Sequence, residues 1–134
     1  MATFKIKVVT YEEKVLEQEA DFVLIRTTEG DMGILANHAP FIAELSIGEM
    51  KIRLGENEEK YFVSGGLVEI SNNVVTIIAT EAIEASKLDI ERERKEVEAL
   101  KAKLAKLKED KDILLTQKNL REALIRVNVV EKML

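Results

Sequence analysis

Two periodicities meet in the stretch VVTIIATEAIEASKLDIERERKEVEAL, which runs from residue 74 to residue 100. Its first part, residues 74–80, is short and rich in β-branched side chains, a pattern typical of a strand. From Ser86 onward lysine, glutamate, leucine and alanine dominate, and neither glycine nor proline occurs up to Leu134. Because these are good helix formers, the chain changes from strand to helix near Ala85. The stretch therefore predicts two domains, residues 1–85 and residues 86–134.

Residues 1–80 show several short strand patterns separated by turn residues. Phe4, Ile6 and Val8 alternate with two lysines, which predicts a half-buried strand. Further strands are expected at residues 15–18, 21–28, 42–47, 49–54, 61–64, 67–71 and 74–80. The turns between them are expected at Gly30, Gly33, Gly48, Gly55, Gly65-Gly66 and Asn72-Asn73, since glycine and asparagine accept positive φ. This pattern predicts an antiparallel β-sandwich, or flattened barrel.

Apolar residues recur at helical spacing in both halves of residues 86–134. The first stripe is Ile90, Val97, Leu100, Leu104 and Leu107, and the second is Ile113, Leu120, Ala123, Val127, Val130 and Leu134. Ser86 and Asp89 resemble a capping box, and the polar run 108–112 offers Asp110 or Asp112 as a second N-cap. Two such helices should form an antiparallel hairpin, so the fold class is α+β. With few apolar side chains to bury, the hairpin should be marginally stable alone.

Composition excludes several classes of chemistry. The chain has 134 residues, no cysteine and a single histidine, His38, which excludes thiol catalysis and a multi-histidine metal site. The absence of disulfides favours a reducing compartment, and no apolar run approaches the ~20 residues that span a bilayer. The net charge of −5 argues against non-specific nucleic-acid binding. Residues 1–85 carry 7 basic and 15 acidic side chains, whereas residues 86–134 carry 13 basic and 10 acidic ones.

The sequence offers no convergent nucleophile, base and metal ligands, so we expect no enzymatic activity of its own. His38 lacks an orienting partner, which favours a structural or interface role over a general base or a pH sensor. Five lysines make the expected hairpin tip basic. They are Lys101, Lys103, Lys106, Lys108 and Lys111. Two interpretations remain open for them, a solvated face and a binding surface for an acidic partner.

Two segments resemble signatures of a known family. The run GDMGILANHAP, residues 30–40, and the run VSGGLVEI, residues 63–70, are similar to segments of the ε subunit of bacterial and chloroplast F-type rotary ATP synthases. The opening IKVVT, residues 6–10, the strand at residues 74–79 and the closing pair of helices also fit. The resemblance covers essentially the whole chain, and it is specific because the segments occur in the family's order and spacing.

The resemblance implies a sandwich followed by two helices, and a role in the central stalk of the synthase. There the sandwich joins the γ subunit to the ring of c subunits. The helices permit ATP hydrolysis when folded and obstruct it when extended along γ. The resemblance also implies a peripheral position on the cytoplasmic side of the cell membrane, with no direct membrane insertion, and no required cofactor.

Several residues match positions with family roles. Asp31 matches a position facing the c-ring and His38 one close to γ, while the basic tip suits contact with an acidic segment of the β subunit in the extended state. Asp89 and Arg92 match a motif that binds regulatory ATP, and Arg126 matches a basic position of the same site. This sequence departs from that motif at Glu93 and Glu122, whose charge would repel a polyphosphate unless it is compensated.

Two other classes of function remain. A stand-alone adaptor with a coiled-coil arm would also combine a β-domain with charged helices, and it should self-associate. An enzyme with a pocket inside a β-barrel is the third class.

Overall fold

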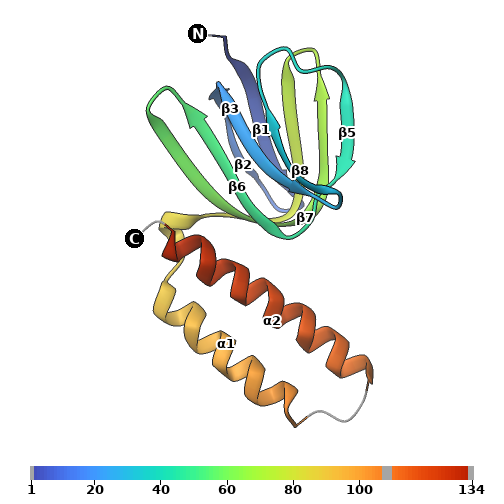
Figure 1. Cartoon of the computed structure of the whole chain (residues 1–134), viewed down its shortest axis with the longest axis vertical. Helices are drawn as coiled ribbons and strands as arrows, with labels where there is room; N and C mark the ends of the chain where they lie inside the picture. The colour runs from blue at the N-terminus through green and yellow to red at the C-terminus, as the bar shows by residue number, and fades with distance from the viewer. Residues whose placement is uncertain (1, 107–109, 133–134) are drawn as a thin grey trace. The chain divides into compact units, whose positions relative to one another are not determined.

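In the computed structural model of the chain, a run of strands is followed by two helices (Figure 1). The structure describes residues 2–106 and 110–132. The chain divides into two compact units, Met1–Glu84 and Ala85–Leu134. The strands are β1 (Phe4–Thr10), β2 (Lys14–Ala20), β3 (Phe22–Thr27), β4 (Gly30–Ile34), β5 (Phe41–Glu44), β6 (Gly48–Leu54), β7 (Asn57–Ser71) and β8 (Val74–Glu84). The predicted fold class, a sandwich followed by two helices, is confirmed.

The strands form one folded-over sheet in the order β2-β1-β8-β7-β6-β3-β4, with β5 paired to β7. Neighbouring strands are antiparallel except β1 and β8, which run parallel from Lys5↔Val74 to Thr10↔Ala79. The sheet bends over itself without closing into a barrel, and β2 contacts β6 across the fold. Of the two predicted geometries, a sandwich and a flattened barrel, the structure therefore has the sandwich. The parallel pairing of β1 with β8 was not predicted from the sequence.

Strand β7 belongs to both layers of the sandwich. Its N-terminal half pairs with β6 from Asn57 to Val63, and its C-terminal half pairs with β5 from Leu67 to Ile70. Its other edge pairs with β8 over nearly its whole length. The change of layer falls between these halves, at Gly65-Gly66.

Two predictions in this region are wrong. Gly65-Gly66 was expected to be a turn between two strands, but the structure has one continuous strand there. A Cβ on Gly66, whose φ is +110°, would lie 1.9 Å from the carbonyl oxygen of Ile78. Gly66 is thus required for close approach of β8 to a bent strand rather than for a chain reversal. Likewise Gly33, expected to be in a turn, lies within β4 and pairs with β3, whereas Gly30, with a φ of 121°, directly follows the turn between β3 and β4.

The core of the sandwich consists mainly of aliphatic side chains at alternate strand positions. Those with the lowest exposure include Ile6, Val8, Val23, Ile25, Ile34, Met50, Ile52, Val68, Ile70, Val75 and Ile77. Each contributes about 1.5–3 kcal/mol by burial, so the alternation alone sets which face of each strand points inward. The Asn72-Asn73 turn between β7 and β8 is confirmed, with φ of 52° and 60°.

A polar cluster closes the end of the β3–β6 pair. The buried carboxylate of Asp21 accepts a hydrogen bond from the Gly55 backbone N–H at 2.6 Å and one from Arg53 Nε at 3.2 Å. These bonds, first that of Gly55, lower the pKa of Asp21. The Arg53 guanidinium lies 4.7 Å from the centroid of the Phe22 ring, which covers Gly33.

The second unit contains a short 3₁₀ turn, η1 (Ala85–Lys87), and the helices α1 (Ile90–Leu104) and α2 (Asp110–Glu131). Asp89 is the N-cap of α1, since its carboxylate accepts from the backbone N–H groups of Glu91 and Arg92 at 3.0 and 3.3 Å. The predicted capping box starting at Ser86 is wrong, because Ser86 lies in η1. Figure 1 shows the helices side by side, and Val97 on α1 and Ala123 and Val130 on α2 are buried.

Candidate functional site: the helical hairpin and the sheet surface

The most buried charged residues of the hairpin join its two helices. Nε of Arg126 on α2 donates to Oε2 of Glu93 on α1 at 2.7 Å, and Nη2 of Arg126 lies 3.5 Å from Oε2 of Glu96. The side chains of Arg126 and Glu93 are each 11% exposed, whereas that of Glu96 is 48% exposed. Arg126 therefore faces two carboxylates in a site largely closed to water, where an unpaired charge would be strongly destabilising.

A second ion pair joins the same helices in contact with solvent. Nη2 of Arg94 donates to Oε1 of Glu131 at 2.8 Å, and the two side chains are 50% and 48% exposed. Such exposed pairs contribute about 0–1 kcal/mol because water and salt screen them. Since Arg94 is near the start of α1 and Glu131 ends α2, the two pairs show that the helices are antiparallel.

The residues predicted to bind ATP do not form one open cluster. Asp89 is occupied as the N-cap, Arg92 is exposed beside it, and Arg126 is bonded to Glu93 and Glu96. Glu122, the other departure from the motif, lies 3.6 Å from Nζ of Lys118. A nucleotide phosphate at Arg126 would have to compete with the two carboxylates that already hold it.

The basic hairpin tip is only partly described. Lys101, Lys103, Lys106 and Lys111 are exposed, while Lys108 lies outside the described residues. Lys101 has Glu98 at 3.9 Å, a loose pair on the helix surface. Lys101 and Lys103 occupy the last turn of α1, where cations interact favourably with the helix dipole. This local role and a binding role are compatible, since all four ammonium groups remain accessible.

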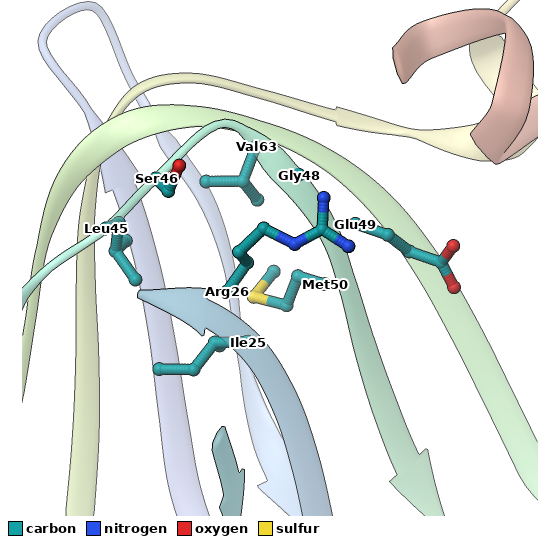
Figure 2. Close-up of a pocket in the computed structure, with 8 residues that line it drawn as sticks. All are labelled: Ile25, Arg26, Leu45, Ser46, Gly48, Glu49, Met50 and Val63. Carbon is teal, nitrogen blue, oxygen red and sulfur yellow. The ribbon is translucent and has the colours of Figure 1, made fainter. Parts of the chain in front are cut away.

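Asp31 lies on β4, directly opposite Arg26 in the β3–β4 ladder. Nε of Arg26 donates to Oδ1 of Asp31 at 3.1 Å, and the Asp31 side chain is 57% exposed. Figure 2 shows the Arg26 side chain extended across β6 beside Gly48 and Met50. A Cβ on Gly48 would lie 3.0 Å from Cβ and Cδ of Arg26, so the absence of a side chain at Gly48 makes room for this pose. The sequence did not single out Arg26.

His38 lies in the loop between β4 and β5, and this loop is hydrogen-bonded to the β7–β8 turn. Its Nδ1 is 2.7 Å from the carbonyl oxygen of Ala39, and its ring meets Phe41 edge-on at 5.9 Å between centroids. Asn37 N–H donates to Oδ1 of Asn73, whose Nδ2 in turn donates to the carbonyl oxygen of Thr3. The loop is therefore held by a polar network, and the half-buried imidazole is held by local contacts.

The outer face of the sheet carries an apolar row that was not predicted from the sequence. Ile42 on β5, Leu67 on β7 and Ile78 on β8 are 66%, 44% and 48% exposed. Leu67 and Ile78 are opposite each other in the β7–β8 ladder, and Ile42 is opposite Glu69, two residues from Leu67. Strand alternation places these side chains opposite the core residues Val68 and Ile77. We define Ile42, Leu67 and Ile78 as the apolar row, a set of neighbouring apolar side chains in contact with solvent. The sequence did contain a signal for this surface, since isoleucine and leucine occur at strand positions where the alternation predicts a polar, outward-facing residue.

Within residues 2–106 and 110–132 no group of three metal-ligating side chains comes together. No helix in that part of the chain has the length and apolar character needed to cross a bilayer. The cavity in Figure 2, lined by Ile25, Leu45, Met50 and Val63 among others, is a small gap between strands.

The fold and these surfaces define a class of protein: a β-sandwich with an exposed apolar row, followed by a charged helical hairpin. The sequence model for the family described as "ATP synthase, Delta/Epsilon chain, beta-sandwich domain" matches residues 3–85. The chain belongs to the family of ATP synthase epsilon chains.

Two relatives show how far the similarity extends. The sodium ion specific ATP synthase epsilon chain of Propionigenium modestum is 55% identical over 132 residues, covering 98% of this chain and 96% of the relative. The epsilon chain of Alkalihalophilus pseudofirmus is 39% identical over 110 residues, covering 82% of this chain and 83% of the relative. The similarity therefore includes the hairpin as well as the sandwich.

Solved structures of ATP synthases contain similar chains. One from the Euglena gracilis mitochondrial ATP synthase matches with a TM-score of 0.75 and 25% identity, covering 99% of this chain and 80% of that one. One from the central stalk and c-ring of the Tetrahymena thermophila mitochondrial enzyme has a TM-score of 0.56 at 16% identity and shows the fold alone.

Proposed function

We propose that this chain is the ε subunit of the central stalk of a rotary ATP synthase, where its sandwich binds γ and the c-ring and its hairpin limits ATP hydrolysis. The observation that carries the proposal is the 55% identity to an epsilon chain across both units. As such a subunit it is peripheral, on the cytoplasmic side of the cell membrane, and catalyses no reaction itself.

The sandwich has two surfaces suited to stable partners. The apolar row would be buried by a protein partner, and three such side chains contribute about 1.5–3 kcal/mol each when fully covered. The Arg26–Asp31 pair is a separate polar surface at the β3–β4 hairpin. We assign Asp31 to contact with the c-ring and the His38 loop to contact with γ.

The hairpin has the features of a regulatory arm. Its enclosed side chains include the charged Glu93 and Arg126 and the small Ala123 as well as aliphatic ones, so part of the surface that the helices bury is polar. Leu114 and Leu115 on α2 are 67% and 59% exposed and provide an apolar surface for a partner. The accessible lysines of the tip are suited to an acidic segment of the catalytic β subunit in the extended state.

The test is reconstitution with an ATP synthase catalytic complex depleted of its own ε, followed by co-elution and ATP hydrolysis. We expect stoichiometric co-elution and slowed hydrolysis, with the slowing relieved by truncation after Ala85. Co-elution without inhibition would remove the regulatory part and keep the stalk part. A chain that fails to bind γ from the same source would overturn the whole proposal.

Regulatory ATP binding at Asp89, Arg92 and Arg126 is a separate proposal. Its test is calorimetric titration with MgATP, with Arg92→Ala expected to abolish the heat of binding. Asp89→Asn is a sharper variant than Asp89→Ala, because asparagine keeps the N-cap while it removes the charge. Equal heats for the wild type and Arg92→Ala would discard this site.

One observation supports a second candidate function. The exposed Leu114, Leu115 and Leu124 on α2 would also suit self-association of an adaptor through a coiled-coil arm. Light scattering of the purified chain separates the two functions, since the stalk subunit should be monomeric and the adaptor dimeric.

A further inference from the structure

We propose that Glu93 and Arg126 form an internal lock, an ion pair that holds the hairpin closed yet allows it to open readily. The inference rests on the proposed regulatory function and adds the residues that set the balance between the closed and open hairpin. We use the name lock for these two side chains alone.

The lock occupies a position that helix periodicity would assign to an apolar residue. Glu93 follows Ile90 by three residues and precedes the buried Val97 by four, so it lies on the inward stripe of α1. Its partner Arg126 follows the fully buried Ala123 by three residues on α2. The charged pair therefore lies within the helix–helix interface rather than at its edge.

In the closed hairpin the charges of the lock are satisfied. Arg126 has Glu93 at 2.7 Å and Glu96 at 3.5 Å, and among the described residues no buried side-chain nitrogen or oxygen lacks a partner. Neutralising either member leaves the other charge in a site that is 11% exposed with only part of its compensation. Loss of one partner should thus favour opening, because only separation of the helices returns the remaining charge to water.

The open hairpin also explains why an ion pair is more useful here than an apolar pair. When the helices separate, the carboxylate and the guanidinium recover their hydration, which offsets most of the lost attraction. Two leucines at the same positions would lose their burial with no such compensation. The lock therefore fixes how the two helices align in the closed hairpin, while the free-energy cost of opening stays small enough for a binding partner to overcome.

The exposed pair Arg94–Glu131 provides a matched control. It joins the same two helices with a similar N–O distance of 2.8 Å, but both side chains are about half exposed. Removing it deletes one interhelical ion pair without leaving a buried charge. The difference between the two pairs isolates the effect of burial.

The experiment is amide hydrogen exchange on the full chain without nucleotide. Glu93→Gln and Arg126→Gln should each raise exchange in α1 and α2 by roughly 10- to 100-fold. Arg94→Gln should raise it less than about fivefold. Glu93→Leu with Arg126→Leu should slow exchange below the wild-type rate. The swap Glu93→Arg with Arg126→Glu, combined with Glu96→Gln so that position 126 faces no second carboxylate, should restore exchange to within about tenfold of wild type. Amides of β1 and β7 report that the sandwich stays folded.

Exchange in Glu93→Gln and Arg126→Gln no faster than in Arg94→Gln would overturn the lock, and so would a charge swap that exchanges as fast as the single variants. A second readout separates this inference from the proposed function: the same variants are added to the ε-depleted complex. Glu93→Gln should inhibit hydrolysis more strongly and the double leucine variant less strongly than wild type. Faster exchange with unchanged inhibition would keep the lock and reject the regulatory role of the hairpin.

Discussion

Replacement of Gly66 by alanine tests whether β7 must bend at this residue. The new Cβ would lie 1.9 Å from the carbonyl oxygen of Ile78 and 2.8 Å from Cα of Ala79, at a φ of +110°. The backbone conformation alone costs a residue other than glycine about 1–3 kcal/mol, and forcing β8 away adds about 1–3 kcal/mol. We expect a total destabilisation of roughly 2–6 kcal/mol, which lowers the Tm of the sandwich by about 4–8 °C for each kcal/mol lost.

Tyrosine fluorescence during urea unfolding measures this loss in the sandwich alone. Both tyrosines, Tyr11 and Tyr61, lie in the first unit, and the chain has no tryptophan. Gly55→Ala is the matched control, because Gly55 has a φ of +63° and open space around its Cα. That variant should lose only about 1 kcal/mol. A Gly66→Ala protein as stable as Gly55→Ala would refute the close approach of β7 and β8 on which the argument depends.

Three further predictions concern the sandwich and its surface. Asp21→Asn should be less stable than wild type at neutral pH, and the urea midpoints of the two proteins should converge as the pH falls. The lowered pKa of Asp21 stabilises the wild-type fold fully above the pKa of the unfolded chain, and this stabilisation is lost as the pH falls through the folded-state pKa. Gly33→Ala should destabilise the sandwich by about 1–3 kcal/mol in the same urea assay, since its Cβ would lie 2.9 Å from the Phe22 ring. Ile42→Ser should change the unfolding free energy by less than about 0.5 kcal/mol yet weaken co-elution with the ε-depleted complex. Co-elution equal to that of the wild type would show that this side chain is not in the interface.

Local sequence patterns were sufficient to predict most of the fold. The alternation from Phe4 to Val8 and the Asn72-Asn73 turn each depend on a few adjacent residues, so they could be predicted without knowledge of the rest of the chain. Gly65-Gly66 could not, because the same glycines serve a turn or a close approach, and only the position of β8 decides between them. The parallel pairing of β1 with β8 joins segments about 70 residues apart, for which no local pattern exists.

The candidate sites were harder to predict for the same reason. Asp31, His38 and the lysines were assigned through the family resemblance, and the structure adds contacts that the sequence does not reveal, such as Arg26 beside Asp31. Glu93 was expected only to repel a phosphate, because its partner Arg126 is 33 residues away. A charge on an otherwise apolar stripe was nevertheless a usable signal, since a buried carboxylate requires a cation from the facing helix.

The passage of β7 through both layers has a mechanical consequence. Because one covalent strand is hydrogen-bonded to β6 in one layer and to β5 in the other, the layers cannot slide past each other without breaking ladder bonds on both sides of Gly66. Shear and torsion applied to one face are thus carried to the other by the backbone itself, rather than by side-chain packing alone. A domain of this construction resists shear between its two layers as one stiff unit.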